Sequence, residues 1–170
     1  MRFSDEAGFE AEAAVLVGRI SALMNEKHSH AACAESLTGG LMASEIVRTP
    51  GVSAWFTEGC VTYTDGAKER RLMVSPALLE EHTAVSRPAA RAMAEGELAA
   101  SRADIAVSTT GLAGPGPDEY GRPAGLVFIG GATKKGSVTR ELHLDGSRLQ
   151  IRQQAVIEAL KLMYGLAKTL

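Results

Sequence analysis

Ser36 stands in the segment A-E-S-L-T-G-G, residues 34–40, whose residue types could carry nucleophilic chemistry. An apolar run before the serine predicts a strand, and a predicted helix follows the two glycines. A turn of this kind exposes the hydroxyl and leaves backbone N–H groups free to bind an anion or an oxyanion, which makes Thr38, Gly39 and Gly40 candidate substrate-binding residues. Taken alone, the segment favours a simpler interpretation, in which Ser36 or Thr38 caps the helix while Gly39 and Gly40 form the turn.

A second candidate segment is V-T-Y-T-D-G-A-K, residues 61–68, in which another predicted strand ends in a polar turn. Tyr63 and Lys68 could face the same crevice as Ser36. A lysine that loses its charge by desolvation can serve as the general base for a hydroxyl. The simpler interpretation is a solvated surface lysine, because most lysines are exposed.

The third segment is T-T-G-L-A-G-P-G-P, residues 109–117, where a predicted strand runs into a loop rich in Gly and Pro. Backbone amides in such a loop could cradle a phosphate, with Thr110, Gly111, Ala113 and Gly114 as the candidate residues. The simpler interpretation is a tight, irregular connection.

The elements that position these segments alternate between strands and helices. The pattern predicts helices over 5–26, 38–48, 66–73, 76–82, 86–102 and 147–168, and strands over 30–34, 60–64, 104–109, 125–133 and 138–144. Ser4 or Asp5 can cap the first helix, and a short polar join predicts a late β-hairpin. We therefore expect a three-layer α/β/α sandwich with a mixed, mostly parallel sheet, whose strand ends hold the ligand. Residues 1–170 are expected to form a single domain, with the helix in 1–26 packed on it.

Composition and charge exclude several classes of function. Of the 170 residues, 45% are hydrophobic and 22% charged, which is ordinary for a globular domain. A net charge of −2 lacks the basic excess of a dedicated nucleic-acid binder. Membrane spans need roughly 18 consecutive apolar residues, and none appears. Because Met1 to Glu10 do not resemble a signal peptide, a cytoplasmic location is expected.

Other catalytic patterns are weak or absent. The sequence contains no P-loop, no G-x-G-x-x-G and no G-x-S-x-G motif. His28 and His30 make a poor metal site, and no metal is expected. Cys33 and Cys60 lack metal-binding spacing and are interpreted as reduced, buried thiols. Since Ser36 has no strong histidine partner, a Ser–Lys arrangement is favoured over a Ser–His–Asp triad.

Together, these segments resemble the CinA C-terminal domain family, whose stand-alone members, called PncC, are nicotinamide-nucleotide amidases. The family pattern A-E-S-C-T-G-G corresponds to residues 34–40. Further matches, in chain order, are S-A-W-F at 53–56, G-x-V-T-Y at 59–63, A-K at 67–68, A-V-S at 84–86, Met93 and Ala94, T-G-x-A-G-P at 110–115, Arg122 to Gly125, G-S-R at 146–148 and Arg152. The resemblance extends from about residue 31 to the last predicted helix.

The resemblance implies a three-layer α/β fold and hydrolysis of nicotinamide mononucleotide to nicotinate mononucleotide and ammonia. It places the nucleophile at Ser36, the lysine at Lys68, a nearby tyrosine at Tyr63 and a basic substrate-binding residue at Arg148. It implies a small-molecule nucleotide partner and a homo-oligomer, with no organic cofactor and no membrane. Larger family members carry an additional N-terminal domain.

The sequence departs from the family pattern at three positions. Leu37 replaces Cys, Thr83 replaces Gly and Ser147 replaces Asp. Two alternatives stay open at this point. One is a nucleotide-binding module without catalysis, and the other is an interaction protein linked to competence or DNA damage.

Overall fold

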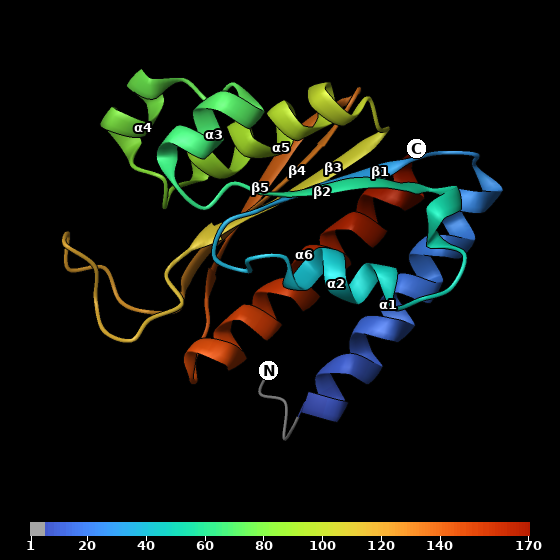
Figure 1. Cartoon of the computed structure of the whole chain (residues 1–170), viewed down its shortest axis with the longest axis horizontal. Coiled ribbons are helices and arrows are strands. Elements are labelled where there is room, and N and C mark those ends of the chain that lie inside the picture. Colours follow the sequence, from blue (N-terminus) through green and yellow to red (C-terminus); the bar gives the residue numbers. More distant parts are fainter. Residues whose placement is uncertain (1–5) are drawn as a thin grey trace.

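The computed structural model describes residues 6–170 and contains a five-stranded sheet with helices on both faces (Figure 1). The helices are α1 (Glu6–Glu26), α2 (Leu41–Val47), α3 (Asp65–Leu72), α4 (Pro76–His82), α5 (Arg87–Ser101) and α6 (Arg148–Thr169), with a short 3₁₀ helix at Val52–Ala54. The strands are β1 (Ala31–Glu35), β2 (Phe56–Val61), β3 (Ile105–Gly111), β4 (Leu126–Thr133) and β5 (Gly136–His143). The predicted three-layer architecture is confirmed.

The sheet has the strand order β2-β1-β3-β4-β5. β1 pairs in parallel with β2 and β3, whereas the β3–β4 and β4–β5 pairs are antiparallel. The predicted mixed sheet and late hairpin are thus confirmed, with the parallel strands on one side and the hairpin on the other. Because the carboxyl ends of the three parallel strands meet at one edge, this edge is where a ligand is expected.

The strand predicted at 60–64 lies earlier in the chain, since β2 runs over Phe56–Val61. β2 is an edge strand, and most of its side chains are exposed. The prediction relied on alternating apolar and polar residues, which mark a strand with one buried face. Because β2 is largely exposed, residues 56–59 lack this alternation, and the predicted strand was placed too late in the chain.

The helices form two layers (Figure 1). α3, α4 and α5 cover one face of the sheet, and α1, α2 and α6 cover the other. The larger core lies under α1 and α6, where Phe9, Val17, Ile20 and Leu160 are buried against strand residues such as Ile129. The predicted helix 5–26 corresponds to α1, and its predicted caps, Ser4 and Asp5, lie outside the described residues.

Serine residues cap α5 and α6 at their N-termini. The Ser86 hydroxyl accepts a hydrogen bond from the Ala89 amide at the start of α5. Ser147 forms a capping box with Gln150 at the start of α6. The Ser147 capping box fixes where α6 begins and therefore where Arg148, its first residue, lies.

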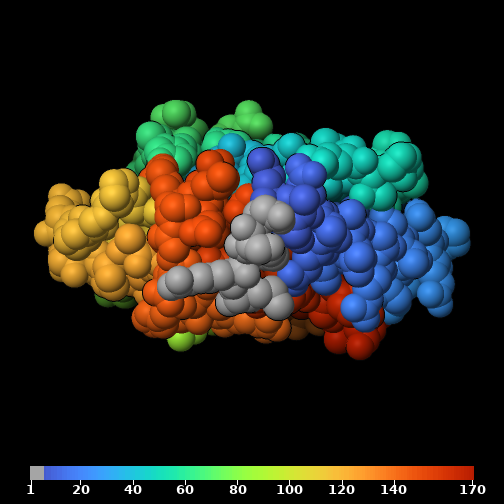
Figure 2. All heavy atoms as spheres, turned by 90° about the horizontal axis from the view of Figure 1, so that it is seen from below, coloured from blue at the N-terminus to red at the C-terminus, as the bar shows by residue number. Residues whose placement is uncertain are grey.

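The loop of residues 112–125 connects β3 to β4 and projects from one end of the molecule (Figure 2). Cys33 and Cys60 are both free thiols, as predicted, but only Cys33 is buried; Cys60, on the edge strand, is half-buried. Among the described residues, no helix has the length and hydropathy that crossing a bilayer requires.

Candidate functional site

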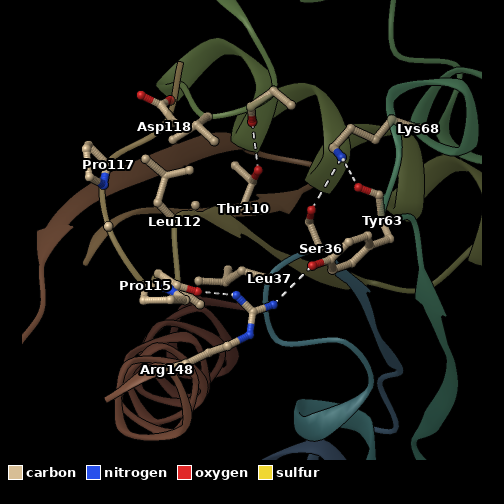
Figure 3. A pocket seen from close by; sticks show the side chains of 16 residues that line it. Ser36, Leu37, Tyr63, Lys68, Thr110, Leu112, Pro115, Pro117, Asp118 and Arg148 are labelled. Carbon is tan, nitrogen blue, oxygen red and sulfur yellow. Dashed lines mark hydrogen bonds between the residues drawn. The ribbon is translucent and has the colours of Figure 1, made fainter. Parts of the chain in front are cut away.

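A cavity of about 330 Å³ lies at the edge where β1, β2 and β3 end (Figure 3). The described residues that line it come from these strand ends, the 112–125 loop, the segment before α5 and the start of α6. They are Ser36, Leu37, Tyr63, Lys68, Ala84, Val85, Thr110, Gly111, Leu112, Ala113, Gly114, Pro115, Gly116, Pro117, Asp118 and Arg148. All three segments that the sequence singled out therefore meet in one cavity.

Ser36 and Lys68 are in direct contact in this cavity. The Lys68 Nζ lies 3.4 Å from the Ser36 Oγ, and it also donates to the carbonyl oxygens of Thr62 at 3.0 Å and Tyr63 at 3.3 Å. Lys68 is only 1% exposed and Ser36 only 8%. Burial lowers the pKa of the Lys68 amine from its ordinary value, while Asp65, 3.9 Å away, acts in the opposite direction. The interpretation of Lys68 as a solvated surface lysine is wrong.

Lys68 is held in place by helix α3 and its contact with α5. The Thr64 hydroxyl accepts from the Ala67 amide and begins α3 immediately after β2. Gly96 of α5 packs so closely against α3 that a Cβ there would lie 2.0 Å from the Leu72 carbonyl oxygen. The helix that carries the lysine is thus fixed at both its start and its end.

Tyr63 and Arg148 form the open side of the cavity, and Figure 3 shows both side chains directed toward Ser36. The Arg148 Nη2 donates to the Tyr63 hydroxyl at 3.2 Å, and its Nη1 donates to the Gly114 carbonyl at 2.6 Å. Tyr63 is 58% exposed. Arg148 therefore joins the end of β2 to the 112–125 loop and presents a positive charge at the mouth.

The turn after β1 is built around Glu35, a residue that the sequence analysis did not single out. This buried carboxylate accepts the backbone N–H groups of Gly40, Met42 and Ala43 at 2.9–3.1 Å. Glu35 therefore satisfies the first amides of α2. The interpretation of Ser36 as a helix cap is wrong, because its hydroxyl contacts Lys68 instead.

Thr38, Gly39 and Gly40, predicted to bind substrate, do not line the cavity. The Thr38 hydroxyl shares a hydrogen bond with Thr109 at 2.7 Å, and the Gly39 N–H donates to the Ser36 carbonyl. The Gly40 N–H is used by Glu35. These residues support the turn from behind, and the turn itself uses the N–H groups of Gly39 and Gly40.

Arg152 of α6 holds the same turn from the opposite side. Its Nε donates to the Leu37 carbonyl at 3.1 Å and its Nη2 to the Thr38 carbonyl at 2.6 Å. Sequence reasoning noted Arg152 only as a family match, and a distance of 114 residues hides the contact from any local pattern. Leu37, the departure beside the nucleophile, is buried against the core.

The predicted loop residues Thr110, Gly111, Ala113 and Gly114 all line the cavity. The Thr110 hydroxyl donates to the Ala84 carbonyl at 2.7 Å. Gly111 has φ 154°, and a Cβ there would lie 2.7 Å from the backbone of β4. The glycine is needed because the two strands approach so closely as the loop begins.

Arg122 is the main polar contact of the 112–125 loop. It forms an ion pair with Asp118, with its Nη2 at 2.6 Å from the Oδ2. Its Nη1 donates to the Thr83 hydroxyl at 2.8 Å and to the Val85 carbonyl at 2.9 Å. Burial alone would raise the pKa of the Asp118 carboxyl, but hydrogen bonds from Arg122 and from the Tyr120 amide hold it below its ordinary value. A sequence motif could have suggested Arg122, but not its partners.

No cluster of three or more His, Cys, Asp or Glu side chains with metal-binding geometry is present within residues 6–170.

Comparison with known proteins identifies the family. The model of the CinA C-terminal domain matches residues 13–167, nearly the whole chain. This protein belongs to the CinA C-terminal domain family.

A competence-damage inducible protein of Clostridium novyi is 45% identical over 130 residues, which is 76% of this chain and 31% of the relative. One of Clostridium botulinum is 42% identical over 141 residues, 83% of this chain and 34% of the relative. The chain thus spans about a third of the length of these curated relatives.

Solved structures of CinA proteins share the fold. The competence/damage inducible protein CihA of Agrobacterium tumefaciens has a TM-score of 0.87 at 37% identity, covering 91% of this chain and 95% of its own. A CinA superfamily protein of Escherichia coli has a TM-score of 0.85 at 31% identity, covering 99% of this chain and 94% of its own. The arrangement of the cavity therefore lies on a fold that CinA proteins hold in common.

Proposed function

We propose that this CinA domain is an amidohydrolase that converts nicotinamide mononucleotide to nicotinate mononucleotide and ammonia. The observation that carries the proposal is the contact of 3.4 Å between Ser36 and a buried Lys68 of lowered pKa. A serine hydroxyl needs a base to attack an amide, and a desolvated lysine supplies one. Lys68 is the only lysine that is buried among the described residues.

In the proposed first step, neutral Lys68 accepts the Ser36 proton as the Oγ attacks the carboxamide carbon. The N–H group of Leu37, a residue that lines the cavity, has no protein acceptor within residues 6–170, so it is the candidate to stabilise the oxyanion. It replaces Thr38, which does not line the cavity, and Gly39 and Gly40, whose N–H groups are already bonded. The protonated lysine then gives its proton to the leaving nitrogen, and ammonia departs.

In the second step, Lys68 accepts a proton from water, and the resulting nucleophile attacks the acyl-Ser36 ester. The product carboxylate leaves, and Ser36 recovers its proton from Lys68. Tyr63, whose hydroxyl is held by Arg148, orients the proton transfers. Arg148 and the 112–125 loop hold the phosphate or ribose, since a guanidinium binds phosphate with charge-assisted hydrogen bonds.

Ser36→Ala tests the nucleophile directly. We expect the variant to lose deamidation of nicotinamide mononucleotide. Its unfolding temperature should equal that of wild type, because the Ser36 hydroxyl caps no helix. Ammonia release is measured across pyridine nucleotides, with Ser44→Ala on the exposed face of α2 as the control. Activity near wild type in the Ser36 variant would eliminate the mechanism.

The same assay separates the rival functions. A nucleotide-binding module without catalysis would bind pyridine nucleotides and release no ammonia. An interaction protein linked to competence or DNA damage, the subject of the relatives' names, would capture its partner equally well with Ser36→Ala. A homo-oligomer and a cytoplasmic location stay predictions from the sequence.

A further inference from the structure

Thr83 has a backbone conformation that a β-branched residue rarely adopts. It follows α4 with φ 63° and ψ 166°, a region occupied almost only by glycine. The family pattern has Gly at this position. A threonine in this conformation has a cost in backbone strain, which a contact made by its side chain could offset.

The Thr83 hydroxyl accepts a hydrogen bond from the Arg122 Nη1 at 2.8 Å. The same Nη1 donates to the Val85 carbonyl at 2.9 Å, and the opposite edge of the guanidinium binds Asp118. Arg122 and Asp118 are only 25% and 14% exposed in their side chains. The partners of Arg122 thus belong to two different segments, and its geometry allows both sets of contacts at once.

Both of these segments line the cavity. Asp118 belongs to the 112–125 loop, and Val85 belongs to the connection before α5. The Asp118 Oδ1 also accepts from the backbone amides of Tyr120 and Arg122, which fixes the loop's own turn. A shift of the Arg122 side chain would therefore move two walls of the site relative to Ser36.

We propose that Thr83 and Arg122 form a clasp that fixes the 112–125 loop against the 83–85 segment and thereby sets the affinity of the site for its substrate. Both are positioning residues, since neither lies among the groups proposed to react. The inference rests on the proposed function for the identity of the substrate, whereas the clasp itself is a property of the free protein.

Three substitutions at Thr83 separate its hydroxyl from its backbone strain. Thr83→Val keeps the branched side chain and removes the acceptor, Thr83→Ser keeps the acceptor, and Thr83→Gly removes both the acceptor and the strain. Amide hydrogen exchange of the 112–125 loop and KM for nicotinamide mononucleotide are measured for each. Arg122→Lys tests the other side of the clasp, because a lysine ammonium cannot contact Asp118 and the 83–85 segment at the same time, as the guanidinium does.

We expect loop exchange and KM to rise by roughly tenfold in the Thr83→Val, Thr83→Gly and Arg122→Lys variants, with kcat changed by less than about twofold. Thr83→Ser should match wild type, and Thr83→Gly should unfold at the same or a higher temperature. Unchanged loop exchange in Thr83→Val overturns the clasp. Faster exchange without a change in KM overturns its effect on substrate affinity. If wild type releases no ammonia, the proposed function fails, and loop exchange still decides whether the clasp exists.

Discussion

Lys68 combines two properties that a surface lysine lacks, burial and a hydroxyl neighbour. An exposed lysine has a pKa near 10.4 and is protonated at neutral pH, so it cannot accept a proton. Burial removes the water that stabilises the charged form, and the pKa of Lys68 falls. The carbonyl oxygens of Thr62 and Tyr63 hold the amine beside Ser36 without adding a full negative charge.

Activity is expected to rise with pH through the lowered pKa of Lys68, because only the neutral amine can act as base. Lys68→Arg should lose nearly all activity, since the guanidinium keeps its proton. The measurement is kcat/KM against pH for wild type and at one pH for the variant, with Lys134→Arg, at a lysine that is 82% exposed, as the matched control. A Lys68→Arg enzyme within a few fold of wild type would disprove the Ser–Lys mechanism even if Ser36 were essential.

Arg148 is expected to bind the phosphate of the substrate. Arg148→Ala should raise KM for nicotinamide mononucleotide more than KM for nicotinamide riboside, which lacks the phosphate, because the lost contact is charge-assisted. Steady-state kinetics with both compounds check this. Equal effects on the two would mean that Arg148 acts through its contacts with Tyr63 and Gly114 instead.

At the scale of elements, helix α2 begins on a carboxylate instead of a hydroxyl. Glu35→Gln should lower the free energy of unfolding by about 1–3 kcal/mol, because the amide group has only one acceptor oxygen for three backbone donors. Chemical denaturation measures the change, with Glu81→Gln, an exposed residue of α4, as the control. Equal stability of the Glu35 and Glu81 variants would contradict the capping role.

The sequence predicted most elements because their local signals agree with the fold. The serine and proline at Ser86–Pro88 mark the start of α5, and Ser147 marks the start of α6. Local patterns cannot show which distant group a donor meets. Thus Glu35, which is adjacent to the nucleophile in sequence, gave no signal of its capping role, and the Arg122–Thr83 contact became visible only in the folded chain.

At the scale of the whole molecule, the packing of α5 against α3 determines where Lys68 lies. Gly96→Ala should destabilise the protein by about 1–3 kcal/mol, because its Cβ would overlap the Leu72 carbonyl. Gly18→Ala, in α1 with no atom within 4 Å of the added Cβ, should instead be neutral or stabilise by up to about 1 kcal/mol. Thermal unfolding compares the two, and a neutral Gly96→Ala would mean that α3 can move away from α5.

The position of α6 in the chain has a consequence for synthesis. This helix carries both arginines of the site edge, Arg148 at the mouth and Arg152 behind the Ser36 turn. A nascent chain that has emerged only through β5 contains Ser36 and Lys68, but nothing yet holds the Leu37 and Thr38 carbonyls or charges the mouth. Within this domain the site is therefore complete only once α6 has been made, and a chain that ends after β5 would contain Ser36 and Lys68 without the two arginines that complete the site.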